Sequence, residues 1–160
     1  RSPVGMYVEN FKEFSPLINR EGPGNFGLLP NGVFCFNKKE FLIFETKKFA
    51  RSKIQCQYAT QSGPLLVIDG KIHPKFIKNG TSKFVRSGVG ISRNGLKAIF
   101  LISNEAVSFH QFASTFLDHF KIDNALYLDG NISRLYSPKL NRKDFGFDIG
   151  PIIAVVAPAE

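Results

Sequence analysis

The sequence predicts an α+β domain in which one long amphipathic helix packs on a mixed, largely antiparallel sheet. Two observations carry this prediction. Short strand-like segments are separated by tight-turn pairs of the Asp-Gly and Asn-Gly kind, at Asn31-Gly32, Asp69-Gly70 and Asn94-Gly95. Only one segment has the spacing of a long helix, so the regular strand–helix alternation of a doubly wound fold is missing.

The helix is expected at residues 108–121. Its apolar side chains recur at helical spacing and form one stripe, while polar side chains cover the opposite face. Ser108 followed by Gln111 has the pattern of a capping box, in which each side chain bonds the backbone N–H of the other residue. The stripe consists of Phe109, Phe112, Ala113, Phe116, Leu117 and Phe120.

The remaining elements are expected to be short strands. The clearest pair is a hairpin of residues 84–92 and 96–103. Residues 54–59 alternate like a strand, and the polar segment 60–64 interrupts this pattern before residues 65–68 resume it. The other predicted strands are 4–9, 33–36, 41–44, 71–73, 125–128 and a closing buried strand at 152–156.

Length and composition indicate a single globular domain. The chain has 160 residues, of which 43% are hydrophobic and 21% charged, and its 17 phenylalanines must supply much of the core. No apolar run is as long as a membrane-spanning helix. The net charge of +8 suits an anionic partner, but the basic residues lack the tight run of a nucleic-acid-binding arm, so no nucleic-acid partner is expected.

The two cysteines, Cys35 and Cys56, lie in strand-like segments and are expected to be free and buried. A disulfide between them would require an oxidising compartment and neighbouring backbones. The cysteines lack metal-ligand spacing. His110 and His119 have no visible nucleophile partner, so the sequence gives only weak support for a Cys-His or Ser-His hydrolase. The sequence identifies no metal site and no cofactor.

A polar segment directly follows the apolar strand 125–128. It contains Asp129, Gly130, Asn131 and Ser133. In open α/β sheets, ligands bind at the carboxyl ends of strands, and glycine after an acid allows a sharp turn or a close ligand. Acid, glycine and amide are also typical of an ordinary turn, so the segment alone supports both interpretations.

Arginine and glycine alternate in the strand-like segment 84–91. Arg86, Gly88 and Gly90 share one face of this strand with Phe84. Two glycines beside an arginine leave a hollow, and a guanidinium is the planar partner of phosphate and carboxylate. Close approach by a ligand or by another element would explain the glycines, and an exposed arginine beside a β-bulge is the alternative.

A further candidate is the break Gln61-Ser62-Gly63-Pro64 between two apolar strands. Its backbone could donate hydrogen bonds to a ligand, and a bulge is the alternative. Asp129 could serve as general acid, general base or nucleophile, but a glycosidase normally needs two carboxylates. Of the two candidates for the second carboxylate, Asp69 is better explained as a turn residue, whereas Glu105 fits either role.

Together these motifs resemble the phosphodiester glycosidase family, in its compact bacterial branch. Each motif alone is weak, but they span nearly the whole chain in the expected order. The resemblance implies one domain over residues 1–160 that cleaves a sugar held through an anomeric phosphodiester. It places Asp129, Gly130 and Ser133 at the acidic strand end, with Arg86 and Gly63 near the same cleft. The matching stretches are residues 2–9, 24–26, 30–34, 59–64, 86–90 and 125–136.

Two departures from the family pattern concern the site. The family carries an Asn- and Gly-rich motif just before its first matching strand, and this sequence starts at Arg1 without that motif. The branch that contains the mannose 6-phosphate uncovering enzyme has a glycine-rich tail after its acid, whereas Asn131-Ile132 follows Gly130 here, so its substrate is not carried over. Bacterial relatives are commonly exported, which implies a periplasmic or extracellular location.

The residues and the resemblance together predict a glycosidase-type hydrolase of a sugar phosphodiester or a related envelope glycan. Arg86 is expected to bind the anion, and Asp129 to act as acid/base or nucleophile. The alternative is a non-catalytic module that binds anionic glycans of the cell envelope. The expected substrate-binding residues are Gly63, Gln61, Gly88, Gly130, Asn131 and Ser133.

Overall fold

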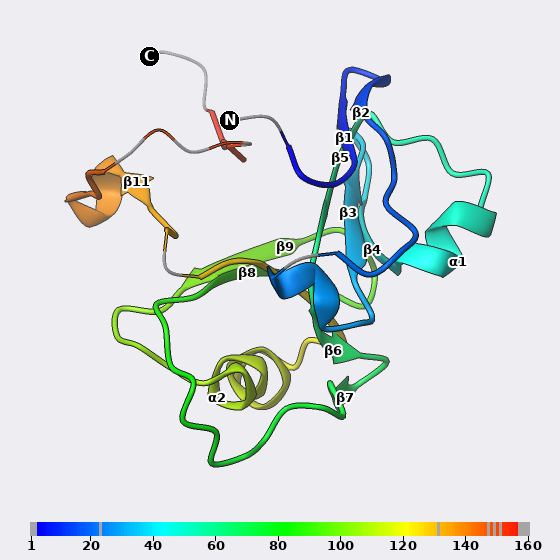
Figure 1. Ribbon diagram of the computed structural model, residues 1–160. Coiled ribbons are helices and arrows are strands. Elements are labelled where there is room, and N and C mark those ends of the chain that lie inside the picture. Colours follow the sequence, from blue (N-terminus) through cyan, green and yellow to red (C-terminus); the bar gives the residue numbers. More distant parts are fainter. Residues whose placement is uncertain are drawn as a thin grey trace.

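The computed structural model describes residues 3–22, 24–130, 132–146, 148, 150 and 152–156, which form two five-stranded antiparallel sheets and a small hairpin (Figure 1). The first sheet has the order β2-β1-β5-β3-β4, with β5 in its centre. Every strand pair in it is antiparallel. Its strands are β1 (Tyr7–Glu9), β2 (Lys12–Ser15), β3 (Gly32–Phe36), β4 (Phe41–Glu45) and β5 (Tyr58–Ser62).

The second sheet has the order β7-β6-β10-β8-β9, so the strand that carries Asp129 is central. All of its pairs are antiparallel as well. A separate small hairpin consists of β11 (Tyr136–Ser137) and β12 (Arg142–Lys143), joined through the turn η3 (Pro138–Leu140). The strands of the second sheet are β6 (Leu65–Ile68), β7 (Lys71–Ile72), β8 (Ser87–Ile91), β9 (Ala98–Ile102) and β10 (Asn124–Asp129).

The predicted helix begins where the sequence indicates but is shorter than predicted. The capping box of Ser108 and Gln111 is present, and the six-residue helix α2 (Phe109–Ser114) starts directly after it. It continues as a five-residue π-helical turn, η2 (Thr115–His119). Lys121 then adopts a left-handed conformation with a φ angle of 56°, which ends the helix. The expectation of a long helix on the sheet was therefore wrong.

Three apolar clusters hold the layers together. Helix α2 lies on the face of the second sheet that points away from the first sheet (Figure 1). Phe112 of α2 and Phe116 of η2 belong to the apolar cluster between the helix and this sheet. Phe34 and Leu126 pack in the cluster between the two sheets. The outer face of the first sheet is covered by a third cluster that includes Phe49 of the short helix α1 (Thr46–Arg51).

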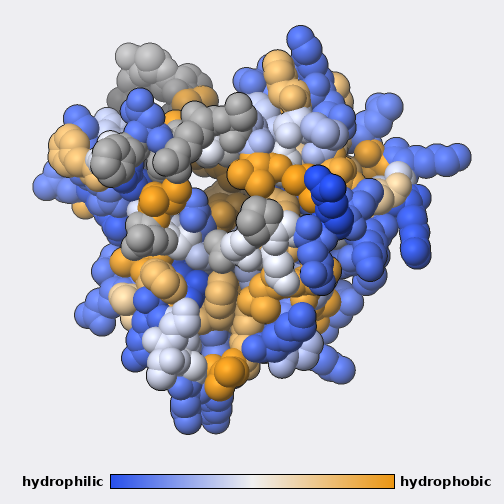
Figure 2. All heavy atoms as spheres, viewed as in Figure 1, coloured by the Kyte–Doolittle hydropathy of each residue, from blue (hydrophilic) through white to orange (hydrophobic). Residues whose placement is uncertain are grey.

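Figure 2 shows the surface that these layers leave exposed. On the face in view, hydrophobic residues gather in the middle, and hydrophilic side chains project around the rim, including the side where α1 lies. A one-turn helix, η1 (Gly24–Gly27), precedes β3. Among the described residues, no helix has both the length and the apolar character needed to cross a membrane.

Local turn signals predicted the hairpins well. Asp69 and Gly70 have φ angles of 47° and 75°, as a type I′ turn requires, and they join β6 to β7. The hairpin β8–β9 also lies within its predicted segments, and the hairpin β3–β4 forms as predicted, with one more residue at the start of β3 and one at the end of β4. The strand expected at 54–59 is displaced, because β5 runs from Tyr58 to Ser62 and pairs with β1 and β3 on its two sides. The strand ends at Ser62, and the cis peptide bond Gly63-Pro64 separates it from β6.

Two further expectations were wrong. Residues 152–156 are not a buried strand, since Ile152, Val155 and Val156 are 76%, 92% and 87% exposed and the segment pairs with no strand of the described chain. Cys35 and Cys56 are not free, because they form a disulfide between β3 and the segment before β5. The sulfurs meet because Cys35 pairs with Ala59 in the sheet, which brings the two backbones to a Cα–Cα distance of 5.6 Å.

Candidate functional site

A hollow of about 320 Å³ lies where β10 ends and the segment before β8 passes beside it. We call it the Arg86–Asp129 hollow. It brings together one guanidinium, one carboxylate and several aromatic rings from segments far apart in the sequence. Its lining consists of Ser82, Phe84, Arg86, Phe109, Tyr127, Asp129, Gly130 and Ile132.

Arg86 is held in place from several sides. Its Nε donates to the Val107 carbonyl at 2.8 Å, and its Nη2 donates to the Ser82 carbonyl at 3.1 Å. The guanidinium carbon lies 3.7 Å from the centre of the Phe109 ring, within cation–π distance. Nη1 donates to the Tyr127 hydroxyl at 3.4 Å, a long hydrogen bond. The side chain is therefore fixed, and Nη1 is its least firmly bonded nitrogen.

The charge of Arg86 is buried without an acidic partner. The residue is 1% exposed, and none of the ion pairs among the described residues includes it. Burial lowers the pKa of its guanidinium, partly offset by Tyr127, although arginine remains protonated at neutral pH. Burying a cation is costly unless it is paired. An anion in the hollow would supply the missing partner, so this geometry favours binding of phosphate or carboxylate.

Asp129 ends β10 next to a bulge. Tyr127 pairs with Gly88 and Asp129 with Ser87, so Leu128 is an extra residue opposite β8. Bulges of this kind redirect side chains at the ends of strands and beside active sites. The Asp129 Oδ1 accepts from the Gly130 backbone N–H at 2.6 Å, and Asp129 and Gly130 both line the hollow. The strand end thus presents an acid to the same space as Arg86.

Ser133 lies behind this strand end rather than in the lining of the hollow. Its hydroxyl donates to the Ser87 hydroxyl at 2.8 Å, and Ser87 Oγ donates to the Asp129 carbonyl at 3.4 Å. The Ser133 N–H also donates to the Gly130 carbonyl at 2.7 Å. Ser133 therefore fastens the turn after Asp129 to the neighbouring strand. Asn131, another predicted substrate-binding residue, lies outside the described residues.

The glycines of β8 make room for the helix. A Cβ at Gly88 would lie 3.0 Å from Phe112 and 2.9 Å from the Leu126 carbonyl, and one at Gly90 would lie 2.8 Å from Phe116. Arg86, Gly88 and Gly90 thus share a face, as the alternation indicates, but α2 fills the space beside Gly88, and η2 with the residues after it fills the space beside Gly90. The close approach at Gly88 is that of another element of the chain.

Gln61 and Gly63 do not line the hollow. The buried Gln61 carboxamide accepts from the Met6 and Ile18 N–H groups at 3.1 and 2.9 Å and donates to the Ile18 carbonyl at 2.8 Å. Its Nε2 also donates to Thr46 Oγ1 at 3.3 Å. Gly63 lies against the Asn31 side chain, which leaves no space for a Cβ at position 63. Both residues serve the framework in the described structure.

Three residues of the site, Tyr127, Phe109 and Ser87, were not predicted as site residues. Tyr127 and Phe109 enclose the guanidinium, and Ser87 bonds the strand end. Neither candidate for a second carboxylate reaches the hollow, since Asp69 pairs with Lys48 at 3.7 Å and Glu105 is exposed. No group of three or more potential metal-binding side chains occurs in the described part of the chain.

The fold and the hollow define a β-rich domain with a candidate anion-binding site beside a single carboxylate. The chain matches the phosphodiester glycosidase (NAGPA) family over residues 1–155, and it belongs to this family.

Two known proteins show the extent of this similarity. The chain is 38% identical over 135 residues to the uncharacterized protein YigE of Escherichia coli K12, covering 84% of the chain and 52% of YigE. Its fold is similar to the catalytic domain of zebrafish N-acetylglucosamine-1-phosphodiester alpha-N-acetylglucosaminidase, with a TM-score of 0.52 and 17% identity. That match covers 80% of the chain and 46% of the zebrafish structure. The chain thus spans about half the length of each.

Proposed function

We propose that the chain is a glycosidase-type hydrolase of a sugar phosphodiester or a related envelope glycan, in which Arg86 binds the anion and Asp129 acts as acid/base or nucleophile. The observation that carries this proposal is the shared hollow of Arg86 and Asp129. A buried guanidinium without an acidic partner among the described residues provides the anion site, and the carboxylate at the strand end provides the reactive group.

The single carboxylate of the described lining suits a phosphodiester better than an ordinary glycoside. A sugar alcohol leaves poorly unless an acid protonates it, which is why glycosidases normally use two carboxylates. A phosphate monoester is already a stable anion and leaves without a proton. A guanidinium beside the departing oxygens stabilises their charge through charge-assisted hydrogen bonds. Arg86 therefore takes over part of the work of the second carboxylate.

The proposed reaction cleaves the bond between the anomeric carbon and the phosphate oxygen. The phosphate monoester leaves with the electron pair of that bond. As a general base, Asp129 takes a proton from a water molecule whose oxygen bonds to the anomeric carbon. As a nucleophile, Asp129 first forms an ester with the sugar, which water then cleaves. Both routes release a free sugar and a phosphate monoester.

The test is hydrolysis of UDP-N-acetylglucosamine or a chromogenic N-acetylglucosamine phosphodiester. We expect Asp129→Asn to lower turnover by about 10²- to 10⁴-fold, because the acid–base or nucleophilic group is lost. Its melting temperature should stay close to that of the wild type. Asp118→Asn, a substitution of an exposed aspartate on η2, is the matched control and should leave turnover unchanged.

Other outcomes would overturn parts of the proposal. A large loss of stability in Asp129→Asn would make Asp129 a structural turn residue. Saturable binding of a phosphorylated polysaccharide without product, weakened by Arg86→Lys but not by Asp129→Asn, would identify a non-catalytic binding module instead.

We also propose a periplasmic or extracellular location. The Cys35–Cys56 disulfide supports it, because disulfides persist in oxidising compartments and are rare in the cytosol. Peptide mapping of protein isolated from its native host under non-reducing conditions checks this point. Two free thiols in that protein would contradict it.

A further inference from the structure

Tyr127 contacts Arg86 from the central strand of the second sheet. Its side chain is 2% exposed, and its ring meets the Phe109 ring at 70° with 4.9 Å between centroids. Phe109 also lies against the guanidinium, so the two rings form a continuous wall around it. The Tyr127 hydroxyl accepts a hydrogen bond from Nη1 of Arg86.

The Tyr127 hydroxyl bonds Nη1 of Arg86, whereas the other two guanidinium nitrogens bond backbone carbonyls. Nε and Nη2 are bonded to the backbone carbonyls of Val107 and Ser82. In the described structure, Nη1 donates to the Tyr127 hydroxyl at 3.4 Å. A bidentate guanidinium recognises a phosphate through two N–H groups in a fixed plane, so the direction of Nη1 matters for affinity.

The same hydroxyl explains why glycine follows Asp129. A Cβ built at Gly130 would collide with the Tyr127 Oη, whereas the next nearest ring atom, Cζ, lies at an ordinary contact distance of 3.6 Å. Glycine at this position therefore makes room for the hydroxyl. Because Gly130 directly follows Asp129 and bonds its carboxylate, Tyr127 connects the acidic strand end with the guanidinium.

We propose that Tyr127 is a positioning residue of the anion site, whose hydroxyl holds Nη1 of Arg86 in the binding plane and seats the guanidinium against the Asp129–Gly130 strand end. Its part in turnover rests on the whole proposed function, whereas its effect on anion binding rests only on the anion site at Arg86 and needs no hydrolysis. Tyr127 acts through Arg86, so its removal should weaken the binding of any tetrahedral oxyanion.

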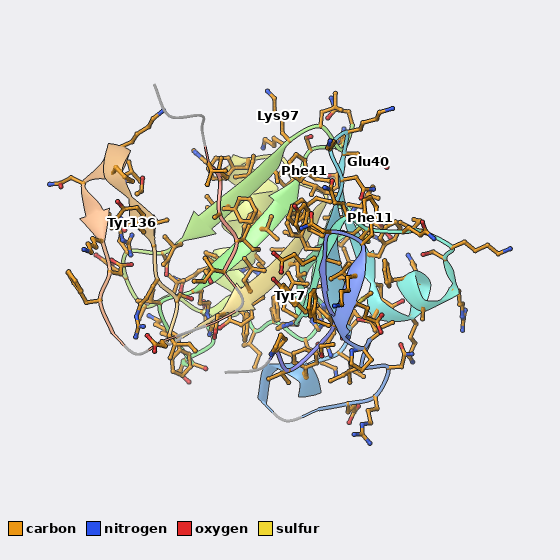
Figure 3. All side chains as sticks on the ribbon, turned by 90° about the horizontal axis from the view of Figure 1, so that it is seen from above. Tyr7, Phe11, Glu40, Phe41, Lys97 and Tyr136 are labelled. Carbon is orange, nitrogen blue, oxygen red and sulfur yellow. A yellow bond between two sulfur atoms is a disulfide. The ribbon has the colours of Figure 1, made fainter. Side chains whose placement is uncertain are left out.

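The first experiment measures the affinity for inorganic phosphate by titration calorimetry. Tyr127→Phe should weaken phosphate binding by about three- to tenfold, the size expected when one hydrogen bond of ordinary strength is lost, because this bond is long at 3.4 Å. With a phosphodiester substrate, the loss should appear mainly in KM. Tyr136→Phe is the matched control, because Tyr136 is 71% exposed on the separate β11 hairpin, at the left edge of the view in Figure 3.

A double-mutant cycle tests the connection to Gly130. Gly130→Ala should weaken phosphate binding by about tenfold in the wild-type background, because its methyl group displaces the hydroxyl. In the Tyr127→Phe background the same change should cost about twofold or less, since the colliding oxygen is gone. Equal effects in the two backgrounds would overturn the proposed connection.

The outcomes separate this inference from the proposed function. Unchanged phosphate affinity and unchanged KM in Tyr127→Phe, with an active wild type, would overturn the role of Tyr127 and leave the hydrolase proposal intact. Weakened phosphate binding in Tyr127→Phe, with no hydrolysis by the wild type, would support Tyr127 as a positioning residue and overturn the hydrolase proposal. Absence of phosphate binding by the wild type would overturn the anion site itself.

Discussion

Arg86 and Gln61 are both buried polar residues from segments that the sequence marked as parts of one site, yet the structure gives them different surroundings. Gln61 uses both its oxygen and its nitrogen for hydrogen bonds to the chain, and it holds the segments around Met6, Ile18 and Thr46 together. Arg86 has two firm bonds to carbonyls, one long bond to a hydroxyl, and a hollow beside it.

The difference lies in what the protein leaves unsatisfied. A buried amide whose groups all have partners in the chain stabilises the fold and needs no ligand. A buried cation without an acidic partner in the described chain is unfavourable for folding alone, and an anionic ligand would relieve that cost. Residue type and position along the chain do not separate these cases, whereas the set of partners does.

Gln61→Met gives the largest effect on the framework side of this comparison. The substitution keeps the volume of the side chain but leaves the N–H groups of Met6 and Ile18 without their acceptor. We expect the free energy of unfolding to fall by about 3 kcal/mol, because buried unpaired groups bear their full desolvation cost. Urea unfolding measures the change.

Phosphate affinity of the folded Gln61→Met protein should stay at the wild-type value. Gln55→Met, at an exposed position shortly before β5, is the control and should leave stability unchanged. A stable Gln61→Met variant with lost phosphate binding would reverse the comparison and place Gln61 in the site.

His73 offers a smaller test of the same principle through pH. The ring is buried, Nε2 faces the Leu29 carbonyl at 3.0 Å, and Nδ1 accepts from the Lys75 N–H at 3.2 Å. Burial lowers the pKa of His73, and Lys75 lowers it further, while the Leu29 carbonyl opposes the shift. The folded protein therefore favours neutral His73, so its contribution to stability is complete above the unfolded pKa of about 6.5 and is lost as the pH falls below that value.

Urea unfolding between pH 8 and pH 5 measures this contribution. Wild-type stability should decrease below about pH 6.5, by less than the effect of Gln61→Met. His73→Gln should be less stable at pH 8 and should show a shallower decrease on acidification. His119→Gln, at an exposed position, should follow the wild-type curve. Identical pH dependence in wild type and His73→Gln would exclude His73 as the source.

Sequence patterns predicted the local parts of this fold. The capping box at Ser108 and Gln111 and the turn at Asp69-Gly70 each depend on residues a few positions apart, and both form as predicted. The Cys35–Cys56 disulfide was missed because it depends on the pairing of β3 with β5, which neither strand encodes alone. The break expected at 60–62 disappears for the same reason, since pairing on both sides carries the strand through polar residues.

In the candidate site, too, some residues could be recognised from local sequence, whereas others depend on how distant segments pack. Arg86 and Asp129 stand out as charges in apolar segments, and the structure lines one hollow with both. Tyr127 looked like an ordinary core residue of a strand. Strand alternation was a usable signal, because Tyr127 lies two residues before Asp129 and adjoins the same hollow. Phe109 offered no such signal, since it belongs to the apolar stripe of the helix and its contact with Arg86 depends on how α2 packs.

Ser87 and Ser133 give the smallest expected effect, at the border between framework and site. Their hydroxyls bond each other at 2.8 Å and tie the turn after Asp129 to β8. Ser87→Ala should lower the free energy of unfolding by about 1 kcal/mol and reduce phosphodiester turnover severalfold, because the strand end is held less firmly. Ser133→Ala should have a similar effect, and the double variant should be little worse than Ser87→Ala, since Ser87→Ala already removes the bond between the two hydroxyls as well as the long bond to the Asp129 carbonyl. Additive losses in stability and turnover would show that the two hydroxyls act separately, and that the strand end is held by other contacts.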